Sequence, residues 1–313
     1  MPQVIVLPPG VALGIIAFLL SLLPAGFFMW LWYLRHHERS IKSSVIALAF
    51  LVGMLLVIPS FRLEDLAYRA WQTFWPQTSH YFAGAVLPIT SWWDILLPAL
   101  GTFAVVAVIE EGLRYMLMRV WLRRSKTVNQ VFDGLLIGLA IGLGFATLEN
   151  TMYFLDQFRQ GSYDTLVFIF FLRFLISTLA HISFAGLMGT LIAQGVFSIF
   201  SPRSYYLSAF FVPWFLHGLY DLLLGIGHGF YAVMLLVPPL LVFVYWTQRR
   251  DFFIIHRKDG KLLVAAEAPQ TTEMKAVQKV LKTEDSPWNK GAPWLSQSKS
   301  YRRITDAFAD GQS

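Results

Sequence analysis

The stretch Gly134-Leu-Leu-Ile-Gly138-Leu-Ala-Ile-Gly142-Leu-Gly144-Phe-Ala-Thr-Leu-Glu149 decides how the chain folds. Its apolar length is typical of a helix that crosses a membrane. Glycines recur along it at spacings that let a neighbouring helix approach closely. A carboxylate ends the run, although a charged side chain within a bilayer costs on the order of 3 kcal/mol even on a lenient insertion scale. Glu149 is therefore a candidate functional residue.

The composition of the whole chain is typical of a polytopic membrane protein. Of its 313 residues, 56% are hydrophobic and only 14% are charged, whereas soluble domains average about 25% charged residues. There is no cysteine, which excludes disulfides, thiolate nucleophiles and cysteine-ligated metal sites. The net charge of +6 lies mainly in the tail and in loops on one side, so it fits the positive-inside rule and not nucleic-acid binding.

Hydropathy predicts an all-α, polytopic helical bundle of about seven transmembrane helices. The expected spans are residues 10–34, 44–59, 94–120, 132–153, 165–200, 205–224 and 230–246. The first of them runs well past the apolar core of a signal peptide and no charged segment precedes it, so we interpret it as a span. Residues 61–93 mix charged and aromatic side chains, which predicts an interfacial amphipathic segment on the outer surface.

Basic residues fall on the same side of the membrane at every predicted crossing. They cluster in residues 35–42, 119–126 and 249–250, so the positive-inside rule predicts an external N-terminus and a cytoplasmic C-terminus. We divide the chain into a transmembrane domain, 1–250, with a motif-bearing core at 94–224, and a polar cytoplasmic tail, 251–313, expected to be flexible. The absence of cysteine and of organelle targeting predicts a multi-pass protein of the bacterial plasma membrane.

Glu110 and Arg114 stand four residues apart in the third predicted span. They share one helix face and can form an ion pair that lowers the cost of burying both charges. Glu111 points at least a quarter-turn away, so we expect it to be free for proton chemistry. The alternative is an ion pair at the membrane edge, but these positions lie several turns inside the span.

Ionisable residues also stand in later spans. His217 and Asp221 are again four residues apart, so the carboxylate can orient the imidazole ring. A lone intramembrane histidine such as His181 often serves only in an interhelical hydrogen bond. At about 1.5 Å per residue, His217 lies near mid-membrane, with Glu149 and Asp221 in the outer half. We therefore expect a site that faces the external side.

Carboxylates and imidazoles can activate water in two ways. They can bind a metal, or a glutamate can act as general base while histidines serve as acid or oxyanion donors. The residue pattern does not choose between these routes. The chain lacks the His-Glu-x-x-His motif of a zincin helix and the signatures of rhomboid and intramembrane aspartyl proteases.

Four motifs, in order and spacing, resemble the PrsW family of intramembrane proteases, which is related to the CAAX prenyl endopeptidases and to the Aph subunit of gamma-secretase. The motifs are Glu110-Glu111-Gly-Leu-Arg114, the run from Asp133-Gly134 to Phe145-Ala-Thr-Leu-Glu149-Asn150, Arg173 with His181, and His217-Gly-Leu-Tyr-Asp221. Arg114 stands where the family usually has lysine, a change that keeps the charge but alters the geometry of its hydrogen bonds.

The resemblance implies a membrane-embedded endopeptidase. The implied site consists of Glu110, Glu111, Glu149, His181, His217 and Asp221, supported by Arg114, Asn150, Arg173 and Asp133. A divalent metal such as zinc is expected on Glu149, His181 and His217 if the mechanism uses one. In the best-known members the substrate is a single-span anti-sigma factor that is cut on its external side.

These observations lead to a hypothesis about chemical roles. Glu110 or Glu111 and Glu149, together with His181, activate water. In this scheme the expected partners are a single-span membrane protein and the lipid bilayer, and not a nucleic acid.

The remaining residues have orienting roles in the same hypothesis. His217, oriented by Asp221, stabilises the oxyanion or binds metal, and Arg114 anchors the glutamate pair. The alternative is a non-catalytic membrane scaffold or a proton-coupled transporter that uses the same polar groups. Transporters commonly contain internal repeats. The chain has no second copy of the Glu149 or His217 motif, which favours the enzyme.

Overall fold

The computed structural model describes residues 9–31, 41–74, 90–125, 127–128, 131–161, 163–197, 202–248, 255–258 and 261–264. Within these residues, six helical segments are long and apolar enough to cross a membrane. They are Gly10–Met29, Ser43–Phe74, Trp93–Arg124, Val131–Gln160, Thr165–Val196 and Pro202–Gly225. The prediction of a polytopic helical bundle is confirmed.

The first two helices are α1 (Pro9–Met29) and α2 (Ser43–Phe74). The prediction that the second span ends near Pro59 is wrong, because α2 continues unbroken through it to Phe74. Proline removes one intrahelical hydrogen bond, but transmembrane helices tolerate that loss. Residues 61–74 of the predicted interfacial segment are therefore helical, and residues 75–89 lie outside the described part of the chain.

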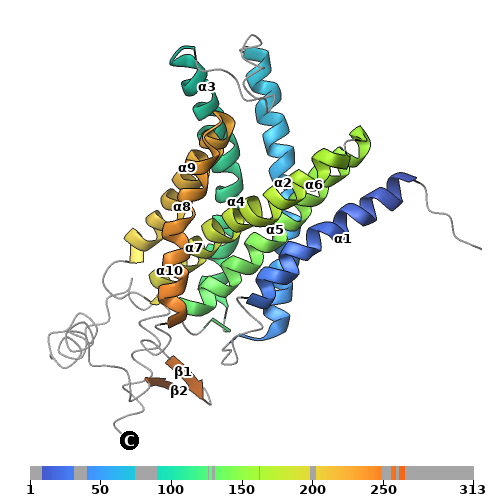
Figure 1. The fold of residues 1–313 in the computed structure, drawn as a ribbon. Helices are drawn as coiled ribbons and strands as arrows, with labels where there is room; N and C mark the ends of the chain where they lie inside the picture. Colours follow the sequence, from blue (N-terminus) through green and yellow to red (C-terminus); the bar gives the residue numbers. More distant parts are fainter. Residues whose placement is uncertain are drawn as a thin grey trace, which may run out of the picture.

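The third span is a continuous path of α3 (Trp93–Gly101), the π-helical turn η3 (Thr102–Ala107) and α4 (Val108–Arg124). A π-helical turn places one extra residue in the turn, and such turns are frequent at functional sites. In Figure 1, α3 and the C-terminal end of α2 both lie at the top of the bundle.

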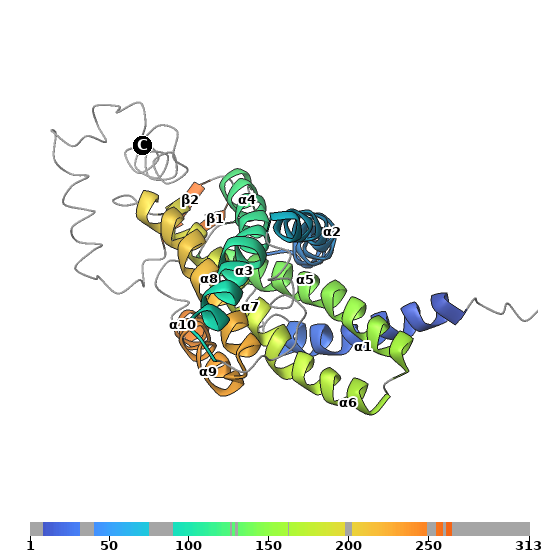
Figure 2. The same cartoon turned by 90° about the horizontal axis from the view of Figure 1, so that it is seen from above.

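Helix α5 (Val131–Gln160) is the centre of the bundle, since 94% of its most apolar stretch is buried. It packs against α7, α2 and α1, and both views show it running between them (Figures 1 and 2). A Cβ atom at Gly138 would collide with the carbonyl oxygen of Ala185, and one at Gly144 with that of Phe50. The predicted close approach of helices along the glycines is confirmed.

The fifth span combines α6 (Tyr163–Leu172), a second π-helical turn, η4 (Arg173–Ser177), and α7 (Thr178–Phe197). The predicted span of residues 165–200 is longer than the roughly 20 residues of a perpendicular helix, and the π-helical turn interrupts it. Helix α7 then lies between α5 and α8 (Pro202–Gly225).

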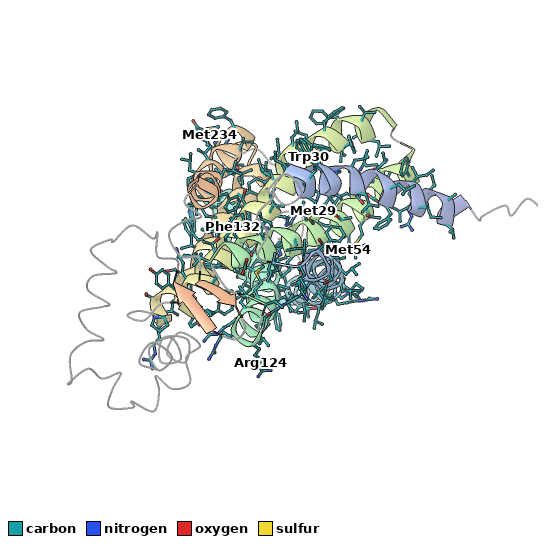
Figure 3. All side chains as sticks on the ribbon, turned by 90° about the horizontal axis from the view of Figure 1, so that it is seen from below. Met29, Trp30, Met54, Arg124, Phe132 and Met234 are labelled. Carbon is teal, nitrogen blue, oxygen red and sulfur yellow. The ribbon has the colours of Figure 1, made fainter. Side chains whose placement is uncertain are left out.

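The predicted seventh span, residues 230–246, is divided between α9 (Gly229–Met234) and α10 (Val237–Gln248). Each of these helices is shorter than the roughly 20 residues that a perpendicular crossing needs. The number of spans and the orientation of the termini therefore remain predictions. Viewed from below, the interhelical space is filled by side chains such as Phe132, while Arg124 projects outward (Figure 3).

A short antiparallel hairpin of β1 (Ile255–Lys258) and β2 (Lys261–Val264) follows the helices. It lies in the predicted cytoplasmic tail. The rest of that tail is outside the described residues, so the division into two domains also remains a prediction.

Candidate active site

Charged and polar side chains from α4, α5, α7 and α8 meet inside the bundle. Glu111 and Arg114 have no solvent exposure, and Glu110, His181 and His217 are at most 6% exposed. Buried charges of this kind are stable only when they are paired and hydrogen-bonded. The contacts between these side chains therefore determine what the site can do.

Arg114 holds both glutamates of its own helix. Its Nη2 donates to Oε2 of Glu110 at 2.6 Å, and its Nη1 donates to Oε1 of Glu111. The predicted pair of Glu110 and Arg114 is present, but the expectation that Glu111 is free is wrong. The two terminal nitrogens of the guanidinium fork reach the carboxylates at i−3 and i−4 at the same time.

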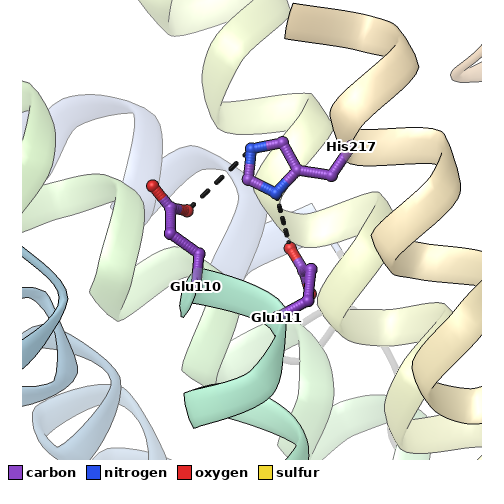
Figure 4. Close-up of side chains that lie close together, drawn as sticks. All are labelled: Glu110, Glu111 and His217. Carbon is purple, nitrogen blue, oxygen red and sulfur yellow. Dashed lines mark hydrogen bonds and ion pairs between the residues drawn. The ribbon is translucent and has the colours of Figure 1, made fainter. Parts of the chain in front are cut away.

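His217 of α8 lies between the same two glutamates (Figure 4). Its Nδ1 is 2.8 Å from Oε1 of Glu111, and its Nε2 is 3.9 Å from Oε2 of Glu110. The Nε2 atom is also 3.3 Å from Oδ2 of Asp221, so the predicted contact between these two residues is present. Phe184 stacks on the imidazole with ring centroids 5.5 Å apart, which further fixes the ring plane.

Glu149 of α5 forms the centre of a second cluster. Its Oε2 is 2.7 Å from Nε2 of His181 and 2.8 Å from Nη2 of Arg173. Arg173 also donates through Nε to Oδ1 of Asn150, whose Nδ2 donates to Oγ1 of Thr178 at 3.1 Å. The residues predicted as supports, Asn150 and Arg173, thus hold the Glu149 carboxylate in place.

Arg114 also connects the two clusters. Its Nη2 is 3.1 Å from Nδ1 of His181, and its guanidinium carbon lies 3.9 Å above the ring centre of Phe145. Arginine is only a donor, so Nδ1 of His181 must accept this hydrogen bond. A neutral His181 then carries its proton on Nε2 and donates it to Glu149.

The π-helical turn η3 ends three residues before Glu110 and is held by α8. The indole Nε1 of Trp214 donates to the carbonyl oxygen of Phe103 at 2.8 Å. Gly218 allows the Phe103 ring to lie on α8, because a Cβ there would come within 2.5 Å of it. Sequence reasoning missed these contacts, and the glycine next to His217 was the only available signal.

Two acidic residues lie at places other than those predicted from the sequence. Asp133 is fully buried, but it precedes Glu149 by sixteen residues of α5, which is about 24 Å along the helix axis. The structure therefore does not bring Asp133 to this site. Glu64 of α2, assigned from the sequence to an interfacial segment, is instead close enough to interact with the charges of Glu110 and Glu149.

Glu110, Glu111 and His217 are suited to hold a metal ion, because their ligand atoms lie within 4.8 Å of one another. Oxygen and nitrogen donors of this kind bind zinc and similar divalent ions. Within the described residues, Oε2 of Glu111 is buried without a hydrogen-bond partner. The ligand set expected from the sequence, with Glu149 and His181 in place of the glutamate pair, remains a prediction.

The charge of the site also fits a divalent cation. The two clusters together contain four carboxylates and two guanidinium groups. With neutral histidines this leaves a formal charge of −2, which one divalent ion or two protons balance. An uncompensated charge of that size is costly inside a membrane protein.

Comparisons with known proteins show the family of the chain. The chain is 25% identical over 224 residues to Protease PrsW of Shouchella clausii, covering 72% of this chain and 90% of that protein. It is 25% identical over 245 residues to Protease PrsW of Clostridioides difficile, covering 77% and 92%. No solved structure shows a significant match. The family model described as PrsW family intramembrane metalloprotease matches residues 41–247. The chain therefore belongs to the PrsW family and is an intramembrane protease.

Proposed function

We propose that the protein cleaves a single-span membrane protein of the anti-sigma-factor type, on the external side of the bacterial plasma membrane. The observation that carries the hydrolytic chemistry is the buried group of Glu110, Glu111 and His217, whose ligand atoms lie within 4.8 Å of one another. The substrate type is the one that the family resemblance implies. The external side follows from the positive-inside prediction. The position of Glu149 also supports cleavage on the external side, because Glu149 lies nearer to the end of α5 that is predicted to be external.

Exposure distinguishes the two neighbouring glutamates. The side chain of Glu111 has no solvent exposure, whereas that of Glu110 is 8% exposed. A general base must reach the proton that it removes. We therefore assign Glu110 to accept a proton from water, and Glu111 to orient His217 through its Nδ1 atom.

The remaining contacts support this assignment of roles to the two glutamates. Asp221 stays beside Nε2 of His217 and keeps the ring turned toward Glu110. Glu149 and His181 form a second acid–base pair, which we assign to proton transfer at the leaving amine. Arg114 holds the two pairs at a constant separation through its contacts with both.

In the alternative, metal-dependent route, Glu110 would be a ligand instead of the base, and Glu110, Glu111 and His217 would hold the metal that the family description implies; zinc is the ion we propose. Bound there, such an ion would supply Lewis-acid chemistry, polarising the scissile carbonyl and making a water molecule more acidic. Glu111 has a suitable atom, because its Oε2 has no hydrogen-bond partner within the described residues.

The test compares wild type with Glu110→Gln and His217→Ala in detergent-purified protein. We expect wild type to cut some members of a panel of single-span membrane peptides, and each variant to lose activity by about 100-fold or more. Thermal unfolding measured in parallel identifies variants that fail only because they are unfolded. The matched control is Asp65→Asn, an exposed carboxylate of α2 that pairs with Arg69.

Metal dependence is tested in the same preparation. We expect elemental analysis to find bound zinc in wild type and less in His217→Ala, and a chelator to abolish cleavage until zinc is restored. Cleavage that survives full metal removal would favour the glutamate general-base route. If no peptide is cut and both variants chiefly lose stability, the polar cluster is structural.

A further inference from the structure

A pocket of about 170 Å³ lies between the second half of α2 and the path of α3 and η3. Its wall consists of Glu64, Tyr68 and Trp71 on one side and Gly101, Val105 and Val106 on the other. The site described above includes none of these six residues. The pocket is too small for a helix, but it has room for one long side chain.

The α2 wall of the pocket combines a carboxylate with two aromatic rings. Glu64, Tyr68 and Trp71 follow one another at i, i+4 and i+7, so they share one helix face. The Ser60 hydroxyl donates to Oε1 of Glu64 at 2.9 Å, which fixes the carboxylate. Within the described residues, Glu64 forms no salt bridge, so its charge has no cationic partner in direct contact.

A carboxylate beside aromatic rings is a favourable environment for a cation. Ammonium and guanidinium groups bind to the faces of tryptophan and tyrosine, and more strongly where water is partly excluded. Glu64 is partly buried, as are Tyr68 and Trp71. The opposite wall is small and apolar, so it can contact the methylene stem of a lysine or arginine while the charged end meets Glu64.

The pocket is close to the catalytic group. Val106 precedes Glu110 by four residues on the same helical path, which is about 6 Å along the axis. An extended peptide covers that distance in about two residues. Glu64 is also close enough to interact with the charges of Glu110 and Glu149.

We propose that this pocket is a specificity subsite that binds a basic side chain of the substrate, within about three residues of the scissile bond. Glu64 supplies the counter-charge, and Tyr68 and Trp71 supply the aromatic walls. The occupant is a lysine or arginine of the membrane-protein substrate. This inference rests on the proposed protease function.

The experiment uses a cleavable single-span peptide in which each residue near the scissile bond is replaced in turn by lysine, leucine or glutamate. We expect wild type to prefer lysine over leucine at one of these positions by about tenfold in kcat/KM, since a buried charge pair discriminates strongly. Glu64→Gln should remove this preference, so that the ratio of kcat/KM for the lysine peptide over the leucine peptide falls to about one. Glu64→Lys should prefer glutamate at the same position.

The matched control is Asp65→Lys, which makes the same change of charge one residue away on an exposed face of α2. It should keep the wild-type preference for lysine. The inference is overturned if Glu64→Gln keeps that preference, or if it slows all peptides equally, because Glu64 would then serve catalysis in general. Thermal unfolding of each variant excludes a loss of fold.

A binding measurement separates failure of this inference from failure of the proposed function. The lysine and leucine peptides, carrying a fluorophore, are titrated into His217→Ala protein with and without Glu64→Gln. Tighter binding of the lysine peptide that depends on Glu64 supports the subsite even if no peptide is cleaved. Equal binding of both peptides rejects the subsite even if cleavage is observed.

Discussion

The two halves of α2 meet their neighbours in different ways. In the first half, Gly53 lies against the backbone of Ile141, and Phe50 lies against Gly144 of the central helix α5. No Cβ atom fits at either glycine without a shift of the backbone. In the second half, α2 faces η3 across the pocket lined by Glu64. One helix therefore contains both a closely packed half and an open half.

The closely packed half supports the site, and we expect the open half to give the substrate access to it. Membrane helices associate through close packing, because lipid is as apolar as the side chains that it replaces. The glycine-rich interfaces of α5 hold Glu149 and, through α7, His181 at a constant separation. A Cβ at Gly142 would lie 2.6 Å from the carbonyl oxygen of His181 itself. The open half contains the pocket, which has room for one long side chain.

The largest expected effect concerns the ion pairs of Arg114 in α4, which lies next to both regions but belongs to neither. Glu111→Ala leaves Arg114 buried without one of its two carboxylates, so we expect a loss of about 3–5 kcal/mol in the free energy of unfolding. Denaturant-induced unfolding in detergent measures it. Asp65→Ala removes an exposed pair and should cost less than about 1 kcal/mol. Similar losses in the two variants would contradict the view that Arg114 depends on its partners.

The next effect tests the closely packed half directly. A Cβ at position 144 collides with the Phe50 carbonyl, so we expect Gly144→Ala to lower the unfolding free energy by about 1–3 kcal/mol. Gly14→Ala on α1 is the matched control, since no heavy atom lies within 4 Å of a Cβ there. If the control is as unstable as Gly144→Ala, close packing against α2 is not the cause.

Substitutions in the open half should lower activity and leave stability unchanged. Val105→Phe fills the pocket from the η3 side, so we expect cleavage of a basic peptide to fall about tenfold, which corresponds to about 1.4 kcal/mol. Thermal unfolding should stay close to that of wild type. Val120→Phe is the control, because Val120 is 52% exposed and far from the pocket. Unchanged cleavage by Val105→Phe would show that the substrate does not pass through this half.

The smallest effect concerns the attachment of η3 to α8. Trp214→Phe keeps an aromatic ring but removes the hydrogen bond to the Phe103 carbonyl. Intramembrane hydrogen bonds average about 0.6 kcal/mol, so we expect a loss of that size in unfolding free energy. Trp92→Phe, at a position 60% exposed, serves as the control. A much larger loss would mean that the π-helical turn itself depends on this bond.

Several features of the fold and the site could be predicted from residue spacing. Glycine spacing predicted the close helix contacts of α5, and spacing by four residues predicted the contact between His217 and Asp221, which are 3.3 Å apart. These predictions succeed because they depend on the geometry of a single helix, which the sequence determines directly.

The errors have two causes: details within one helix and packing between helices. Pro59 predicts a helix end, but α2 passes through it. The fork of Arg114 reaches both carboxylates of its own helix at once, so Glu111 is not free. The position of Glu64 beside the site depends on how α2 packs across α5 and η3. None of this packing is visible in the periodicity of one segment.

The π-helical turn η3 (Thr102–Ala107) has a consequence for how this enzyme tolerates insertions and deletions. Deleting one residue from that turn would leave Glu110 in its present phase, whereas straightening the turn into α-helix at unchanged length would rotate Glu110 by about 100° relative to α3. Glu110 would then turn away from His217, although every side chain of the site would still be present. The same reasoning applies to η4 (Arg173–Ser177), which contains Arg173 itself. Two π-helical turns thus set the phase of Glu110 and of the helix that contains His181.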